Sequence, residues 1–171
     1  MIRWADRCWY GASGKMDAVS TDAGPGTITI ERVDAAATYP LRAQELRQGR
    51  PVEIDEDDAP YTIHLAAVLD GGIVGVVRFH PRDCPWREAE APWQLRGMAT
   101  DAGVRGLGAG RALVAEGLSR IAALGGDLVW CDARKAAVGF YERIGFTIVT
   151  DEYELTPVGL HRGMLIELPI R

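Results

Sequence analysis

The sequence lacks the features that mark secreted and nucleic-acid-binding proteins. Its three cysteines, Cys8, Cys84 and Cys131, are widely spaced and never form a C-x-x-C pair, so they predict free thiols in a reducing compartment rather than a disulfide framework. No lysine- or arginine-rich run occurs, and the net charge is −5 at pH 7. Electrostatics therefore favours neither nucleic acid nor an anionic membrane as a partner, and small cationic acceptors match the charge better.

Long apolar runs are also scarce. The N-terminus carries charged side chains and no apolar run of the length that a signal peptide needs. The most apolar stretch, 61–79, is interrupted by Asp70-Gly71-Gly72, and such a turn predicts a β-hairpin rather than a membrane span. We therefore expect a cytoplasmic protein without a membrane partner.

Composition predicts one globular domain. The chain has 171 residues, of which 47% are hydrophobic and 25% charged, and this is enough for one domain with a sizeable core. Residues 1–26 show no hydrophobic period and contain several glycines and serines, so we expect a flexible N-terminal lead-in there. The domain itself is predicted to span 27–171.

Hydrophobic periodicity from residue 27 onward predicts an α/β fold in the order β-α-β-β-β-α-β-α-β-β. The expected sheet is mixed, mostly antiparallel, of about six to seven strands, and flanked by helices. Strands are predicted at 27–33, 61–69, 73–79, 93–100, 127–132, 146–149 and 160–168. Helices are predicted at 40–48, with Pro40 as the first helical residue, and at 136–144. Another helix is predicted to follow a glycine-rich loop at 104–111 and to end near 125.

The chain is organised around a glycine-rich loop, Val104-Arg-Gly-Leu-Gly-Ala-Gly-Arg111, that runs into an amphipathic helix. Its glycines let the backbone come close to a ligand, and the first amides of a helix have no carbonyl partner inside it. These amides and the positive end of the helix dipole favour a phosphate, and Arg105 and Arg111 add charge. The loop predicts an anion-binding site without naming its ligand.

Spacing separates three phosphate loops that could explain this stretch. A P-loop is excluded because Gly110 is followed by Arg111 and Ala112, not by lysine and a hydroxyl residue. A dinucleotide fingerprint fits poorly because its third glycine would fall on Arg111 or Leu113. Asp132, placed at the end of the next strand, could still serve as the ribose-binding acid of that motif. A nucleotide-cofactor enzyme therefore remains a distant alternative.

The remaining pattern, Arg105-x-x-Gly108-x-Gly110 entered from strand 93–100, resembles the acyl-coenzyme A loop of the GNAT superfamily of N-acetyltransferases. A second segment, 137–146, resembles the A-x-x-F-Y-x-x-x-G-F segment of that family and follows one strand after the helix of the loop. The resemblance covers about 28–170, and the ending 153–164 is similar to the ElaA-like branch. It implies a GNAT fold and acetyl-coenzyme A-dependent transfer of an acetyl group to a primary amine by direct attack on the thioester.

The resemblance also implies which residues form the site. The backbone of 98–100 would bind the pantetheine arm and the acetyl carbonyl, the loop would bind the pyrophosphate, and Tyr141 would protonate the departing thiolate. Arg134 stands where many relatives carry an asparagine, so the resemblance does not establish whether this position contacts the pantetheine arm. The residues carried over for the coenzyme are Met98, Ala99, Thr100, Arg105, Gly106, Gly108, Ala109, Gly110, Arg111 and Arg134.

Tyr141 has a second interpretation as a core aromatic, because Ala137 and Ile144 lie at helical spacing from it. The motif favours catalysis, since a phenol of pKa ~10 can protonate a thiolate of pKa ~8.5 without prior ionisation. Cys131, inside a strand, is expected to be a small buried hydrophobe rather than a nucleophile. The general base is left open among His64, His161, Glu53, Glu88, Asp101 and a chain of water molecules.

Several alternatives stay open. The acidic segment 49–60 is either a solvated loop, which is favoured, or an acceptor-recognition element. His80-x-x-x-Cys84 lacks the second ligand pair that structural zinc needs, so no metal is expected. A non-catalytic acyl-coenzyme A binder or regulator is the second hypothesis. The acceptor amine is not specified, because relatives acetylate very different amines through variable loops. The oligomeric state is not specified either, and a homodimer is one possibility because dimers are frequent among relatives.

Overall fold

The computed structural model describes residues 26–51 and 59–169. The lead-in predicted at 1–26 lies outside the described residues except for its last residue, and so does most of the acidic segment 49–60. Within the described ranges, no helix combines the length and the apolar character that crossing a membrane requires.

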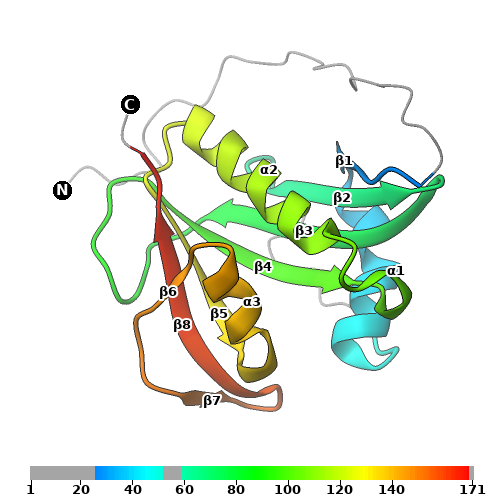
Figure 1. Cartoon of the computed structure of the whole chain (residues 1–171). Helices are drawn as coiled ribbons and strands as arrows, with labels where there is room; N and C mark the ends of the chain where they lie inside the picture. The colour runs from blue at the N-terminus through cyan, green and yellow to red at the C-terminus, as the bar shows by residue number, and fades with distance from the viewer. Residues whose placement is uncertain (1–25, 52–58, 170–171) are drawn as a thin grey trace.

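The core of the fold is one sheet in the order β1-β2-β3-β4-β5-β8-β6, with β7 paired to β8 (Figure 1). Its strands are β1 Thr29–Arg32, β2 Ile63–Leu69, β3 Gly72–Pro81, β4 Pro92–Thr100, β5 Leu128–Arg134, β6 Thr147–Ile148, β7 Tyr153–Leu155 and β8 Gly159–Glu167. Among the described strands only β4 and β5 pair in parallel. The predicted mixed, mostly antiparallel α/β domain is thus confirmed, with eight strands where six to seven were expected.

The described residues form three α-helices, which pack on the sheet, and two short 3₁₀ turns. They are α1 Ala35–Arg47, α2 Ala109–Ala123, α3 Val138–Arg143, η2 Ala102–Val104 and η3 Lys135–Ala137. Leu113 and Ile121 of α2 and Tyr141 of α3 share one core cluster with inward residues of the central strands. Leu41 of α1 packs on Val76 and other residues in a second cluster. Because side chains alternate along a strand, α1 covers one face of the sheet, and α2 and α3 cover the other.

The first helix corrects the prediction that it starts at Pro40. It begins at Ala35, and Pro40 lies inside it. Proline removes one amide donor, and the carbonyl that loses this donor belongs to Ala36, one turn earlier. Both residues are exposed, so water satisfies that carbonyl and the helix continues. The end is closer to expectation: α1 stops at Arg47, and Gln48 and Gly49 follow with positive φ values of 54° and 83°.

The second helix lies very close to the sheet. Gly117 faces the Phe79 ring, and a Cβ added at Gly117 would lie 2.2 Å from that ring. Phe79 is fully buried. Glycine at this helical position therefore serves close packing of α2 on β3, which offsets its low helix propensity.

Candidate functional site

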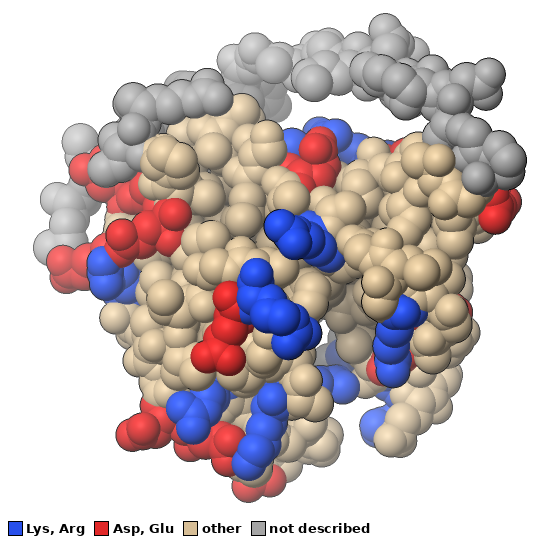
Figure 2. Space-filling model, viewed as in Figure 1, with Lys and Arg blue, Asp and Glu red and all other residues tan. Residues whose placement is uncertain are grey.

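The site begins where β4 and β5 separate. The two strands pair only through Pro92–Gln94 of β4 and Leu128–Trp130 of β5. Beyond these pairs β4 runs on to Thr100 and β5 to Arg134 without pairing to each other. The two strands therefore leave an opening between them beyond Gln94 and Trp130. Figure 2 shows the surface hollowed between the part that carries α3 and the part that carries α1, with basic side chains along both rims.

A bulge in β4 lies beside this opening. The β3–β4 register passes from Arg78 opposite Arg96 to Val76 opposite Ala99, so β4 carries one more residue than β3 in this interval. Gly97 adopts a φ of 59°, which favours glycine. Such an extra residue stays outside the regular ladder. Backbone polar groups of 97–98 are therefore displaced from regular pairing next to the opening.

The glycine loop ends at the start of α2, as predicted. Gly106 and Gly108 have φ values of 89° and 90°, and Gly108 is the N-cap residue of α2. The first carbonyl to accept a helical hydrogen bond is that of Gly108, from the Ala112 amide. The amides of Ala109, Gly110 and Arg111 precede this bond and are directed out of the helix start. This geometry suits a phosphate group.

Gly110 brings the loop into contact with β4. A Cβ added at Gly110 would lie 2.9 Å from Cε of Met98 and 3.4 Å from the Phe140 ring. Met98, Gly110 and Phe140 therefore meet at the side of the opening that faces α2 and α3. Phe140 is partly buried against the main core cluster.

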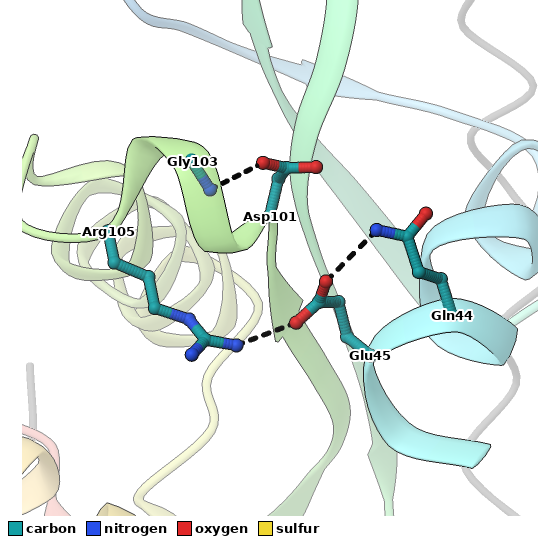
Figure 3. A network of polar contacts seen from close by, with 5 residues as sticks. All are labelled: Gln44, Glu45, Asp101, Gly103 and Arg105. Atoms are coloured by element: carbon teal, nitrogen blue, oxygen red, sulfur yellow. Dashed lines mark hydrogen bonds and ion pairs between the residues drawn. The ribbon is translucent and has the colours of Figure 1, made fainter. Parts of the chain in front are cut away.

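Arg105 makes a contact that the sequence does not predict. Its guanidinium forms an ion pair with Oε2 of Glu45 in α1, at 2.6 Å (Figure 3). The other oxygen of Glu45 accepts a hydrogen bond from the Gln44 side chain. Nearby, a carboxylate oxygen of Asp101 accepts the Gly103 amide at 2.7 Å, so this candidate base acts as the cap of η2. Arg105 thus connects the loop to α1.

Tyr141 lies on the same side of the sheet as the glycine loop. Its side chain is buried, and its hydroxyl donates to the sulfur of Met98 at 3.5 Å. Phe140 and Phe146 pack against its ring at centroid distances of 5.1 Å and 5.3 Å. Burial raises the pKa of Tyr141 well above its usual value, so the phenol stays protonated. Tyr141 is therefore both a core aromatic and a hydroxyl donor beside the opening.

The opposite face of the opening carries a carboxylate group. Asp132 accepts a hydrogen bond from Nε2 of Gln94 at 3.1 Å and one from the Tyr153 hydroxyl at 2.6 Å. The Tyr153 ring stacks on His161, at a centroid distance of 6.4 Å. The prediction that Asp132 ends its strand is wrong, because β5 continues to Arg134. The signal for its orientation was present in the alternation of β5, where Cys131 is buried and Asp132 faces the other way.

The remaining predicted residues lie in varied surroundings. Ala99 is buried in the cluster under α1 and Thr100 ends β4. Arg134 is exposed and donates to the Leu46 carbonyl at 3.2 Å, which ties the end of β5 to α1. His64 is buried on β2, two strands away from β4, and Glu88 is exposed in the loop before β4. Glu53 lies outside the described residues.

Cys131 behaves as expected. The thiol is buried in the main core cluster, and burial raises its pKa above its usual value. A neutral, enclosed thiol is a poor nucleophile. Cys131 therefore packs as a small apolar residue.

A mixed sheet whose parallel pair opens beside a glycine-lined helix start is the arrangement of the N-acetyltransferase fold, the class that the two motifs predict. The chain belongs to the Acetyltransferase (GNAT) family, whose family profile matches residues 29–146. Proteins of this family use acyl-coenzyme A. The doubly wound parallel sheet of dinucleotide-binding proteins is not present in the described residues, so the nucleotide-cofactor alternative loses its structural basis.

Individual relatives agree with this assignment. The chain is 28% identical over 137 residues to the uncharacterized N-acetyltransferase YitI of Bacillus subtilis (strain 168), an alignment that covers 78% of this chain and 92% of YitI. The structure of this chain is similar to that of Escherichia coli ElaA, with a TM-score of 0.65 and 22% sequence identity. The match covers 81% of this chain and 99% of ElaA. The structure also resembles an aminoglycoside 6′-N-acetyltransferase complexed with coenzyme A, with a TM-score of 0.67 and 16% identity over 84% of this chain and 98% of that protein. These structural similarities confirm the fold, and membership of the ElaA-like branch stays a prediction.

Proposed function

We propose that this protein is an N-acetyltransferase that moves an acetyl group from acetyl-coenzyme A to a primary amine by direct attack on the thioester. The observation that supports it best is that the Tyr141 hydroxyl, the Met98 side chain and the start of α2 meet beside the opening between β4 and β5. One end of this arrangement suits an anion, and the other offers a hydroxyl donor beside a sulfur atom.

The residues around the opening fit a coenzyme A thioester. The amides of Ala109, Gly110 and Arg111 would hold the pyrophosphate, and the exposed Arg111 side chain adds positive charge. A Cβ at Gly110 would press on Met98 and Phe140, so glycine there lets α2 begin close to β4. When bound, the coenzyme would supply the activated acetyl group.

The chain would contribute three things to the reaction. The bulge at Gly97 and Met98 offers backbone groups to hold the acetyl carbonyl, and a single well-placed donor of this kind contributes ~10²–10³-fold in rate. Tyr141 would donate its proton to the departing sulfur, a role worth ~10²–10⁴-fold. The side chains along both sides of the opening would hold the two reactants in one orientation.

The second candidate is an acyl-coenzyme A binder without turnover. It would need the start of α2 but not a hydroxyl in the core. Tyr141 directs such a hydroxyl at a sulfur atom from a position where phenylalanine would pack equally well, which favours the enzyme.

The experiment that separates the two candidates measures coenzyme release. The purified chain would be mixed with acetyl-coenzyme A and a panel of primary amines, and free thiol would be measured over time. Titration calorimetry with coenzyme A would be run in parallel. Thiol release that depends on an amine supports the enzyme; binding of the coenzyme without release on any amine supports the binder.

A further inference from the structure

We propose that Asp132 receives the acceptor amine, so that amine and coenzyme sulfur meet from opposite faces of the sheet. This inference rests on the proposed acetyl transfer and adds the residue that would contact the acceptor. Asp132 would be a catalytic residue that accepts a hydrogen bond and then a proton from the attacking nitrogen.

The first support is the position of the carboxylate. Gln94 and Trp130 form the last pair between β4 and β5, and Asp132 lies two residues farther along β5. Its hydrogen bond to Gln94 at 3.1 Å reaches back to β4. The carboxylate therefore lies at the vertex where the two strands separate, the point at which a ligand in the opening would be reached from this face.

The second support is the face on which the carboxylate lies. Cys131 and Ala133 belong to the core cluster that contains Tyr141. Asp132 lies between them on β5, so its side chain is directed to the opposite face. Tyr141 and Asp132 thus flank the opening from its two sides. An acyl group held between the strands would have its sulfur near Tyr141 and an open approach for nitrogen near Asp132.

The third support is how the carboxylate is held. Gln94 is buried, and the Tyr153 ring is packed by Trp86 at 6.3 Å and His161 at 6.4 Å between centroids. One donor binds each oxygen of Asp132. An ionised carboxylate can accept about four hydrogen bonds, so capacity remains for an amine. A functional group fixed by packed neighbours is preorganised, and its orientation costs little when the ligand arrives.

Tyr153 is suited to this supporting role. Burial, and then the hydrogen bond and charge of Asp132, raise the pKa of Tyr153 above its usual value. Tyr153 therefore stays a neutral donor and does not compete with Asp132 for the proton of the amine. Tyr153 would act as a positioning residue through Asp132.

Other carboxylates around the sheet already have structural partners. Asp101 accepts the Gly103 amide, Glu45 pairs with Arg105, and Asp127 accepts the backbone amides of Glu90 and Ala91 at 2.7 Å and 3.0 Å. Each of these bonds fixes a turn, a loop or a helix. Asp132 is instead held by two side chains at the vertex of the opening.

The chemical step balances with these groups. The lone pair of the neutral amine forms the nitrogen–carbon bond while the carbon–sulfur bond breaks and its electron pair leaves on sulfur. The sulfur takes the hydroxyl proton of Tyr141. The nitrogen, which is acidic once it is bonded to the acyl carbon, gives its extra proton to Asp132. Water then returns Tyr141 and Asp132 to their starting states, so no oxidant, reductant or metal is consumed.

Asp132→Asn tests the inference. Asparagine keeps the size, and its Oδ1 can still accept from Tyr153, while its Nδ2 faces Gln94 and can donate to Oε1 once the Gln94 amide turns over. We expect the melting temperature and coenzyme A affinity to stay near wild type and kcat to fall by about 10²-fold or more. Tyr153→Phe should lower kcat by a smaller factor and leave coenzyme affinity unchanged. Glu154→Gln, at the exposed neighbour on β7, is the matched control and should keep wild-type kcat.

The outcomes separate this inference from the proposed function. If wild type releases coenzyme with an amine and Asp132→Asn does so at the same rate, the assignment of Asp132 is overturned while the proposed function stands. If wild type binds coenzyme A but releases none from acetyl-coenzyme A with any amine, the proposed function fails and the inference fails with it. A loss of kcat in Asp132→Asn with unchanged coenzyme binding, beside an active Glu154→Gln, supports the inference.

Discussion

The hydroxyl of Tyr141 lies 3.5 Å from the sulfur of Met98, so a buried phenol is directed at a thioether. A thioether is a weak acceptor and exchanges readily for a better one. The sulfur of a bound coenzyme could therefore take the place of the Met98 sulfur without reorienting Tyr141. This relationship motivates the first prediction.

Tyr141→Phe should keep the packing of the ring and remove only the donor. We expect kcat to fall by about 10²-fold or more while the affinity for coenzyme A changes little. Thiol release would measure the first quantity and titration calorimetry the second. Because burial raises the pKa of Tyr141 well above its usual value, the wild-type rate should show no loss from ionisation of this phenol below about pH 10. An unchanged kcat on an established acceptor would rule out the proton-donor role.

Gly108→Glu should abolish coenzyme binding. Acetyl-coenzyme A at about 100 times its dissociation constant stabilises the folded state by about 2.7 kcal/mol and should raise the melting temperature of wild type by several degrees. A glutamate at the N-cap of α2 would put negative charge where the pyrophosphate is expected. Differential scanning fluorimetry should then show no ligand-induced shift.

The control for this substitution lies at the other end of the same helix. Gly125 also has a positive φ, and no atom lies within 4 Å of a Cβ added at Gly108 or at Gly125. Gly125→Glu therefore imposes similar backbone strain, about 1 kcal/mol, far from the loop. It should keep the full ligand-induced shift. If a folded Gly108→Glu protein kept that shift as well, the anion site would have to lie elsewhere.

Glu45→Gln should strengthen coenzyme binding. The ion pair holds the Arg105 guanidinium 2.6 Å from the Glu45 carboxylate, and the substitution would release it for the pyrophosphate. We expect the affinity for coenzyme A to rise several-fold at low salt and the gain to shrink as salt increases. Stability should change by about 1 kcal/mol or less, because the Arg105 side chain is 64% exposed and, although the Glu45 side chain is only 11% exposed, glutamine keeps its size and an acceptor for Gln44. A weaker affinity by calorimetry would instead mean that Glu45 positions Arg105 for binding.

Gly117→Ala should destabilise the domain through overpacking. The new Cβ would lie 2.2 Å from the Phe79 ring, so α2 or the ring must move. We expect a loss of about 1–3 kcal/mol in the free energy of unfolding, measured by urea denaturation. Gly139→Ala in α3 provides the contrast, because its Cβ would make an ordinary contact of 3.5 Å with Arg143. Equal stability in the two variants would contradict the close packing of α2 on β3.

Local signals explain why much of the fold could be predicted. Alternating and helical periods lie within single elements, so the order of strands and helices followed from the sequence. The glycine loop could also be predicted from the sequence, because positive φ at Gly106 and Gly108 is a property of the loop itself. Tyr141 was located through the motif around it, and its contact with Met98 brought two predicted residues together.

The features that were missed depend on residues far apart in the chain. Asp132 meets Gln94 and Tyr153, which are 38 and 21 positions away, and no sequence pattern links positions so far apart. The extra residue at Gly97 becomes a bulge only through its register with β3. The start of α1 was misplaced because proline is a strong boundary signal, while the exposure that lets Pro40 lie inside the helix is a tertiary property.

The short ladder between β4 and β5 also has a mechanical consequence. Only three residue pairs of the strand ladder join the half-sheet β1–β4 to the half-sheet β5–β8, and side-chain bonds such as that of Gln94 with Asp132, together with the packed helices, supply the rest of the cohesion. A ligand that contacts both β4 and β5 links the two half-sheets. The free energy with which it binds is then also free energy that resists their separation. At the opening between β4 and β5, tighter ligand binding and a more rigid domain therefore go together.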